Sequence, residues 1–138
     1  MAENNPLFDL SQPRVMAILN VTPDSFYDGS RTQADDDIAM RARNIVAQGG
    51  AMIDVGACST RPDSEPASEE EEIDRLRRGL AIARRVAPSA VLSVDTFRAD
   101  VARMAVEEYG VSIINDISGG CDEMYKAVAE LHVPYVLT

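Results

Sequence analysis

Aromatic side chains are scarce in this sequence. Phe and Tyr together make up 5% of the 138 residues, and Trp is absent. The core must therefore be built from the aliphatic side chains that dominate the 46% hydrophobic fraction. Such side chains suit parallel strands covered by helices. At this length we expect a single domain over residues 1–138.

Cysteine and histidine are almost missing. Cys58 and Cys121 are too few for a disulfide framework, and neither lies in a Cys-x-x-Cys pair. His132 is the only histidine, so the sequence offers no zinc-type ligand spacing. We expect both thiols to be reduced in a cytoplasm and His132 to have a structural role.

Positive charge and long apolar runs are also lacking. The chain has 13 basic and 23 acidic residues, a net charge of −10, which argues against a nucleic-acid surface or a polybasic membrane anchor. No apolar run approaches the roughly 20 residues of a membrane span, and residues 1–13 carry no signal-peptide pattern. These absences predict a cytoplasmic protein. An anionic substrate would need a local cation, because the overall field repels it.

Several catalytic motifs are absent as well. The sequence has no G-x-G-x-x-G, no G-x-x-x-x-G-K-[ST] and no G-x-S-x-G. A dinucleotide fingerprint, a Walker loop and a nucleophile elbow are therefore excluded. The polar groups that remain can bind and orient a ligand, and none forms a nucleophile and base pair.

What the sequence does contain is a regular alternation of short apolar runs and segments with helical spacing. This alternation predicts a parallel sheet with helical crossovers. The first apolar run has the length of a fully buried strand. We expect strands at Val15–Leu19, Ala51–Val55, Val91–Val94, Val111–Ile114 and Pro134–Leu137, and helices at Asp35–Gln48, from the Ser68 cap to Val86, at Arg98–Tyr109 and at Asp122–Leu131.

Two of the expected helices carry start signals. Ser68 and Glu71 form a Ser-x-x-Glu capping box. Asp35, Asp36 and Asp37 stand in the expected first turn of another helix, where the helix dipole favours acidic side chains. The Asp triplet could alternatively be a metal cluster, and the sequence leaves that alternative open.

Polar side chains follow each of the first four expected strands. They are Asn20, the Ser59-Thr60-Arg61 run, Asp95 and the Asn115-Asp116 pair. Because the carboxyl ends of parallel strands lie at one edge of a sheet, we expect these groups to converge on a shared site.

Two architectures fit this alternation equally well. One is half of a (β/α)₈ barrel, and the other is a flavodoxin-like doubly wound domain, such as a phosphate-binding or receiver-type module. A receiver carries an acidic pair after its first strand, whereas Asn20 ends the first strand here.

Four segments resemble one known family, in the same order and each at a strand end. They are Asn20–Phe26, Asp54–Gly56 with Ser59–Pro62, Ser93–Thr96 and Ile114–Gly119, and they look like the motifs of dihydropteroate synthase. The resemblance implies an α/β fold, the N-terminal portion of a (β/α)₈ TIM barrel with five parallel strands alternating with four helices. It also implies a transferase of folate biosynthesis that is a target of sulfonamides.

The implied reaction joins 7,8-dihydropterin pyrophosphate to 4-aminobenzoate and gives 7,8-dihydropteroate and diphosphate. In this family diphosphate is thought to leave early, so that the aniline nitrogen attacks a cationic pterin. Such a reaction needs stabilisation of the leaving group and exclusion of water, and it needs no protein nucleophile.

The resemblance also implies roles for individual residues. Loops at Thr22–Phe26 and Arg61–Pro62 would close over aminobenzoate. By position, Asn20 would bind Mg²⁺ on the diphosphate, and Thr60 and Arg61 would bind the substrate phosphates. Asp95 and Asn115 would bind the pterin ring. Asp24 and Arg61 would be catalytic, and the residues in contact with substrate would be Phe26, Pro62 and Ile117.

The family's later sites would lie beyond Thr138. We therefore expect this chain alone to have little or no activity, and to associate with itself because a half-barrel has two open strand edges. Its partners would be small-molecule substrates and other copies of the chain, with no nucleic acid and no membrane. Two alternatives remain. One is a non-catalytic pterin-binding fragment, and the other is a folate–corrinoid methyltransferase domain that shares Asp95 and Asn115 but lacks the two aminobenzoate loops.

Overall fold

A computed structural model describes residues 9–22, 31–59 and 62–138. The described residues form one sheet of five strands, and every neighbouring pair of strands is parallel. The strands are β1 Met16–Asn20, β2 Met52–Gly56, β3 Val91–Asp95, β4 Ile113–Asp116 and β5 Tyr135–Leu137. They alternate along the chain with α1 Arg31–Ala47, α2 Glu69–Val86, α3 Ala99–Tyr109 and α4 Asp122–Leu131.

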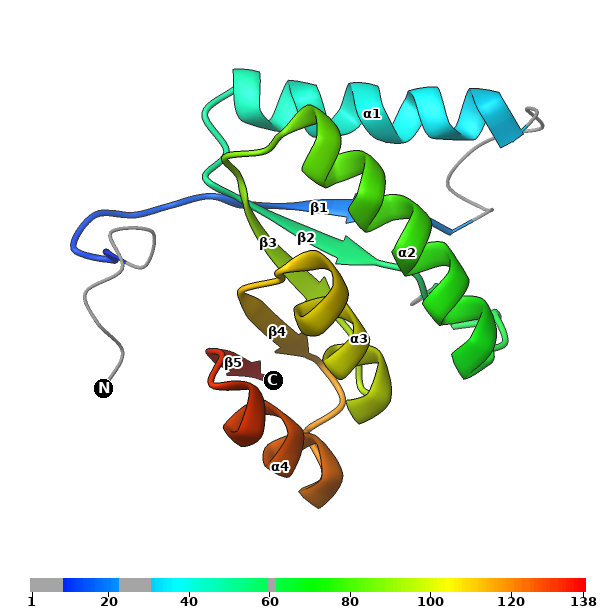
Figure 1. The fold of residues 1–138 in the computed structure, drawn as a ribbon, viewed down its shortest axis with the longest axis vertical. Helices are drawn as coiled ribbons and strands as arrows, with labels where there is room; N and C mark the ends of the chain where they lie inside the picture. The colour runs from blue at the N-terminus through cyan, green and yellow to red at the C-terminus, as the bar shows by residue number, and fades with distance from the viewer. Residues whose placement is uncertain (1–8, 23–30, 60–61) are drawn as a thin grey trace.

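The order of the strands decides between the two architectures left open by the sequence. The sheet runs β1-β2-β3-β4-β5 without a reversal, whereas a doubly wound sheet changes direction at a switch point. Crossovers of one hand in a sequential order place every helix on the same face of the sheet. Figure 1 shows the helices in succession along the curved sheet. The half-barrel prediction is confirmed, and the doubly wound alternative is wrong.

Neighbouring helices pack side by side, α1 on α2, α2 on α3 and α3 on α4. Ion pairs join each of these contacts: Arg78 with Asp35, Arg77 with Glu108 at 2.7 Å, and Arg103 with Glu130 at 2.6 Å. These pairs are partly exposed, so each adds little stability. Among the described residues, none of the helices is long and apolar enough to cross a membrane. The cytoplasmic location stays a prediction.

The start of α1 differs from the prediction. The helix begins at Arg31, so Asp35, Asp36 and Asp37 lie beyond its first turn and do not serve as dipole-matching residues there. Asp35 instead pairs with Arg78 of α2. Sequence spacing could not reveal this ion pair, because it forms only when the two helices pack together.

Other helix ends match their sequence signals. The Ser68 side chain accepts a hydrogen bond from the Glu71 backbone N–H at 3.2 Å, which confirms the cap of α2. Gly110 ends α3 in the left-handed conformation with φ of 64°, and His132 ends α4 with φ of 55°. His132 therefore terminates a helix, in line with its predicted structural role.

Side chains of the strands alternate between a covered face and an open face. The covered face packs on the helices and supplies fully buried residues, namely Leu19, Ile53, Val55, Leu92, Val94 and Ile114. On the opposite face, Met52, Val91 and Ile113 form a smaller apolar cluster. The expectation that Val15–Leu19 is fully buried is wrong, because Val15 is 63% and Ile18 60% exposed. β1 is an edge strand, and Ile18 faces away from the helices.

Gly79 sets how closely α2 approaches the end of β1. A Cβ atom at Gly79 would lie 2.7 Å from Cγ1 of Val21, which is too close for two carbon atoms. We expect Gly79→Ala to lower the free energy of unfolding by about 1–2 kcal/mol, since overpacking a buried contact outweighs the gain in helix propensity. Urea denaturation followed by circular dichroism measures this change.

Ala81 on the exposed side of the same helix provides the control. Ala81→Gly should also lower stability, by about 1 kcal/mol, through helix propensity alone. If Gly79→Ala were stabilising, helix propensity would dominate at both positions and the close packing on Val21 would have no energetic effect.

Candidate functional site

The strand register brings the predicted polar residues into one row across the sheet. Asn20 is paired with Gly56, Gly56 with Asp95, and Asp95 with Asn115. Residues paired in register point to the same face of a sheet. The prediction that Asn20, Asp95 and Asn115 share one rim is therefore confirmed. The row lies at the carboxyl ends of β1–β4, on the face that the helices leave open.

Gly56 makes room for the oxygen atoms on either side of it. A Cβ atom at this position would lie 3.4 Å from Asn20 Oδ1 and 3.8 Å from Asp95 Oδ2. The gap is thus flanked by an amide oxygen and a carboxylate oxygen, the ligand type that Mg²⁺ prefers. In the described part of the chain, no group of three or more His, Cys, Asp or Glu side chains gathers around a potential metal position. The residues fit an ion that takes one or two protein oxygens and completes its shell with water or phosphate.

Asp54 is a site residue that sequence reasoning missed. Its side chain lies on the same face two residues before Gly56, and the residue is only 5% exposed. Its carboxylate accepts hydrogen bonds from Ser93 Oγ at 2.7 Å and from Asn115 Nδ2 at 3.0 Å. Asp54 thereby fixes the orientation of the Asn115 amide. The available signal was an acidic residue inside the apolar run Ala51–Val55, because burying a carboxylate in a strand is costly unless it has hydrogen-bond partners.

Asp95 is the residue of the row whose pKa is shifted most clearly. Burial raises the pKa of the Asp95 carboxyl to about 6, and repulsion from the carboxylates of Asp54, Glu72 and Asp116 adds to this rise. The Asp95 carboxyl therefore changes its protonation state near pH 6. Below that pKa it is a hydrogen-bond donor as well as an acceptor, and above it only an acceptor.

Asp116 lies on the other side of the sheet. The sequence places it beside Asn115 at the strand end, but alternation along β4 turns its side chain toward Tyr135, whose Oη donates to it at 2.6 Å. Burial opposes ionisation of Asp116, yet hydrogen bonds from Ser118 and Tyr135 outweigh burial and lower its pKa. The expectation that Asp116 joins the shared rim is wrong. It supports the loop that begins with the exposed Ile117.

The loop after β2 is described at residues 57–59 and 62–68. Pro62 is exposed in this loop, and a cavity of about 360 Å³ lies between Thr22, the loop and the start of α2. Ser59, Ser64 and Ser68 are among the residues that line it. Thr60, Arg61, Asp24 and Phe26 lie outside the described residues, so their roles stay predictions.

Parallel strands that present amide and carboxylate groups at their carboxyl ends define a class, the α/β barrel-type proteins that bind small polar ligands at this rim. A family model described as pterin binding enzyme matches residues 16–138. The chain belongs to this family.

Proteins that are similar in sequence and in structure are consistent with this family. The chain is 44% identical over 136 residues to a folate synthesis bifunctional protein of Arabidopsis thaliana, covering 95% of this chain and 28% of that protein. A structure of dihydropteroate synthase from Xanthomonas albilineans with 4-aminobenzoic acid matches 93% of this chain and 47% of its own, at 39% identity and a TM-score of 0.80. The enzyme from Anaplasma phagocytophilum with bound 6-hydroxymethylpterin-monophosphate matches 90% and 48%, at 35% identity and a TM-score of 0.80. The chain thus spans less than half the length of these relatives.

The raised pKa of Asp95 predicts a pH-dependent stability. The folded state holds a proton on Asp95 up to about pH 6, whereas the unfolded chain releases it near pH 3.8. Stability from this group is therefore highest below about pH 4 and is lost as the pH rises to 6. We expect Asp95→Asn to raise the free energy of unfolding at pH 7 by about 1–2 kcal/mol, with little effect at pH 4.

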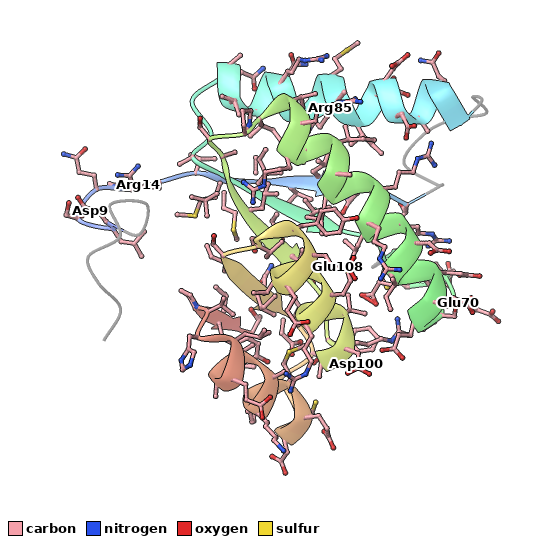
Figure 2. All side chains as sticks on the ribbon, in the orientation of Figure 1. Asp9, Arg14, Glu70, Arg85, Asp100 and Glu108 are labelled. Carbon is pink, nitrogen blue, oxygen red and sulfur yellow. The ribbon has the colours of Figure 1, made fainter. Side chains whose placement is uncertain are left out.

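Denaturation of both proteins across pH 4–8 measures this difference. Asp100→Asn is the control, because Asp100 is an exposed carboxylate in the first turn of α3 (Figure 2). A gain from Asp95→Asn that is the same at pH 4 and pH 7 would contradict the assignment.

Proposed function

We propose that this chain is the N-terminal part of a dihydropteroate synthase and that its strand-end row binds the pterin ring. The register of Asn20, Gly56, Asp95 and Asn115 carries the proposal. A pterin presents ring N–H and amino donors next to a carbonyl acceptor. Asp95 supplies an acceptor and Asn115 supplies an amide, which match those groups. The ligands of the Xanthomonas and Anaplasma enzymes, an aminobenzoate and a phosphorylated pterin, support this choice.

The reaction we propose is the transfer of the pterin methyl carbon from diphosphate to 4-aminobenzoate. The aniline nitrogen forms a bond to the exocyclic carbon, the bond from that carbon to the diphosphate oxygen breaks, and the aniline proton leaves. This reaction needs positioning and charge stabilisation more than a nucleophile. In the proposal, Asp24 and Arg61 act in catalysis, Thr60 binds phosphate, and Phe26, Pro62 and Ile117 contact substrate.

Mg²⁺ would be held at Asn20, whose amide oxygen borders the gap at Gly56. A divalent cation supplies charge neutralisation to a diphosphate leaving group. A chain with a net charge of −10 repels a free diphosphate, so a cation at the rim also favours its binding.

The first test is isothermal titration calorimetry with 7,8-dihydropterin pyrophosphate, in the presence and absence of Mg²⁺. We expect Mg²⁺ to strengthen binding by about tenfold or more, the typical effect of one good charge-assisted contact. Asn20→Ala should remove that strengthening and leave the Mg²⁺-free affinity within about twofold.

Asn44→Ala is the matched control, since Asn44 is exposed on α1. Binding that is equally strong with and without Mg²⁺ would favour a non-catalytic pterin-binding fragment. Binding of a pterin without any preference for the diphosphate would favour the methyltransferase alternative. No binding at all would exclude the proposal.

We also propose that the chain forms a homo-oligomer. β1 and β5 are the two edges of the described sheet, and parallel edges with unpaired backbone groups invite pairing. Exposed apolar side chains lie on these strands, among them Ile18 on β1 and Val136 on β5. Burying them between copies would be favourable.

Light scattering tests the oligomer. We expect a mass above the 15.0 kDa of one chain, and Val136→Lys should shift it to the monomer, because a charged side chain on an edge strand opposes pairing. Val46→Lys, a change of a similarly exposed valine on α1, should leave the mass unchanged. A wild-type monomer would overturn this proposal alone and not the pterin site.

A further inference from the structure

A buried carboxylate outside the row connects the second and third strand-end loops. Glu72 lies in the first part of α2 and is fully buried. Its Oε1 accepts a hydrogen bond from Thr96 Oγ1 at 2.8 Å, and its Oε2 accepts one from Arg98 Nη1 at 2.7 Å. Thr96 and Arg98 lie in the connection between β3 and α3. The charge of Glu72 is thus compensated by one cation and one hydroxyl, as a buried charge requires.

Arg98 extends this cluster to the loop after β2. Its Nη2 donates to the backbone oxygen of Ala67 at 2.8 Å, and Ala67 is buried at the end of that loop. A guanidinium can make both contacts at once because its donors form a rigid planar fork. The Glu72 carboxylate holds this fork in place. A displacement of the Arg98 guanidinium would therefore release the Ala67 end of the loop.

The other end of the same loop is also fixed to α2. Arg75 Nη1 donates to the backbone oxygen of Ala57 at 3.1 Å. Cys58, next along the chain, lies near Glu72: burial raises the pKa of the Cys58 thiol, and the Glu72 carboxylate raises it further. Arg75 of α2 therefore holds the loop at Ala57, and Arg98, which is itself bonded to Glu72 of α2, holds it at Ala67.

The cluster also reaches the row itself. The Thr96 backbone N–H donates to the backbone oxygen of Asn115 at 3.0 Å, while its side chain donates to Glu72. Thr96 Oγ1 in turn accepts from the Arg98 backbone N–H at 3.2 Å. A continuous set of contacts thus runs from α2 through the loop after β3 to the strand that carries Asn115.

We propose that Glu72 is a positioning residue, which through Arg98 holds residues 62–68 of the loop after β2 in the position needed to bind the phosphate end of the ligand. The identity of the ligand in this inference rests on the proposed function, whereas the contacts between Glu72, Arg98 and the loop do not depend on it. Glu72 touches no substrate. Its effect should fall on the phosphate contacts of the loop, and not on the ring contacts of Asp95 and Asn115.

Glu72→Gln is the informative change, because it keeps the size of the side chain and removes its charge. An amide offers one oxygen acceptor, so it cannot accept from both Thr96 and Arg98 through separate oxygens. Glu70→Gln is the matched control. Glu70 lies in the same acidic first turn but points outward from the end of α2 (Figure 2).

The first experiment is hydrogen–deuterium exchange of the ligand-free chain. We expect Glu72→Gln to speed exchange at residues 62–68 by about tenfold or more, the size of a lost hydrogen bond to a charged group. Exchange in the middle of α2, around Leu80, reports global stability and should change much less. Equal acceleration in the loop and around Leu80 would show a purely structural role and overturn the inference.

The second experiment compares two ligands by calorimetry with Mg²⁺, 6-hydroxymethyl-7,8-dihydropterin and its diphosphate ester. Glu72→Gln should weaken binding of the diphosphate by about tenfold and leave the unphosphorylated pterin within about twofold, while Glu70→Gln changes neither. Equal weakening of both ligands would overturn the inference. If the wild-type chain bound neither ligand, the proposed function would fail, and local loop exchange would then support the positioning contact or refute it.

Discussion

The parallel register of β1 to β4 is the constraint on which the rest of this structure depends. It places Asn20, Gly56, Asp95 and Asn115 in one row, although these residues are far apart in the sequence. A slip of one residue in any strand would turn its polar group toward the helices, where the core is apolar. The buried side chains on the helix-covered face therefore fix the positions of the polar groups on the open face.

This arrangement brings several carboxylates close together in an already acidic chain. Their charges are stabilised by hydrogen bonds at two of them and disfavoured at a third. Asp54 receives donors from Ser93 and Asn115, and Glu72 receives a guanidinium and a hydroxyl. Asp95 has its pKa raised instead, because burial and its carboxylate neighbours disfavour its charge. Asp54 and Glu72 thus act as fixed acceptors within the fold, whereas Asp95 changes its protonation state near pH 6.

Much of the fold was predictable because its signals are local. Short apolar runs, helical spacing, the Ser68 cap and the stop at Gly110 depend on neighbours within a few residues, and the structure confirms them. The errors came from contacts between distant segments. Asp35 looked like a helix-start residue but pairs with α2, Ile18 looked buried but lies on the open face of an edge strand, and Asp116 looked like a rim residue but faces Tyr135.

By itself, the sequence determined the order of strands and helices and the residue types at the strand ends, because hydrophobic period and turn chemistry act over short distances. Only the tertiary structure decided which strand pairs with which, and so excluded the doubly wound alternative. It also revealed Asp54 and Glu72, two acidic residues whose roles depend on partners 39 and 26 positions away, at Ser93 and Arg98. No local pattern encodes such pairs, since burial and hydrogen bonding across elements arise only when the sheet and its helices pack.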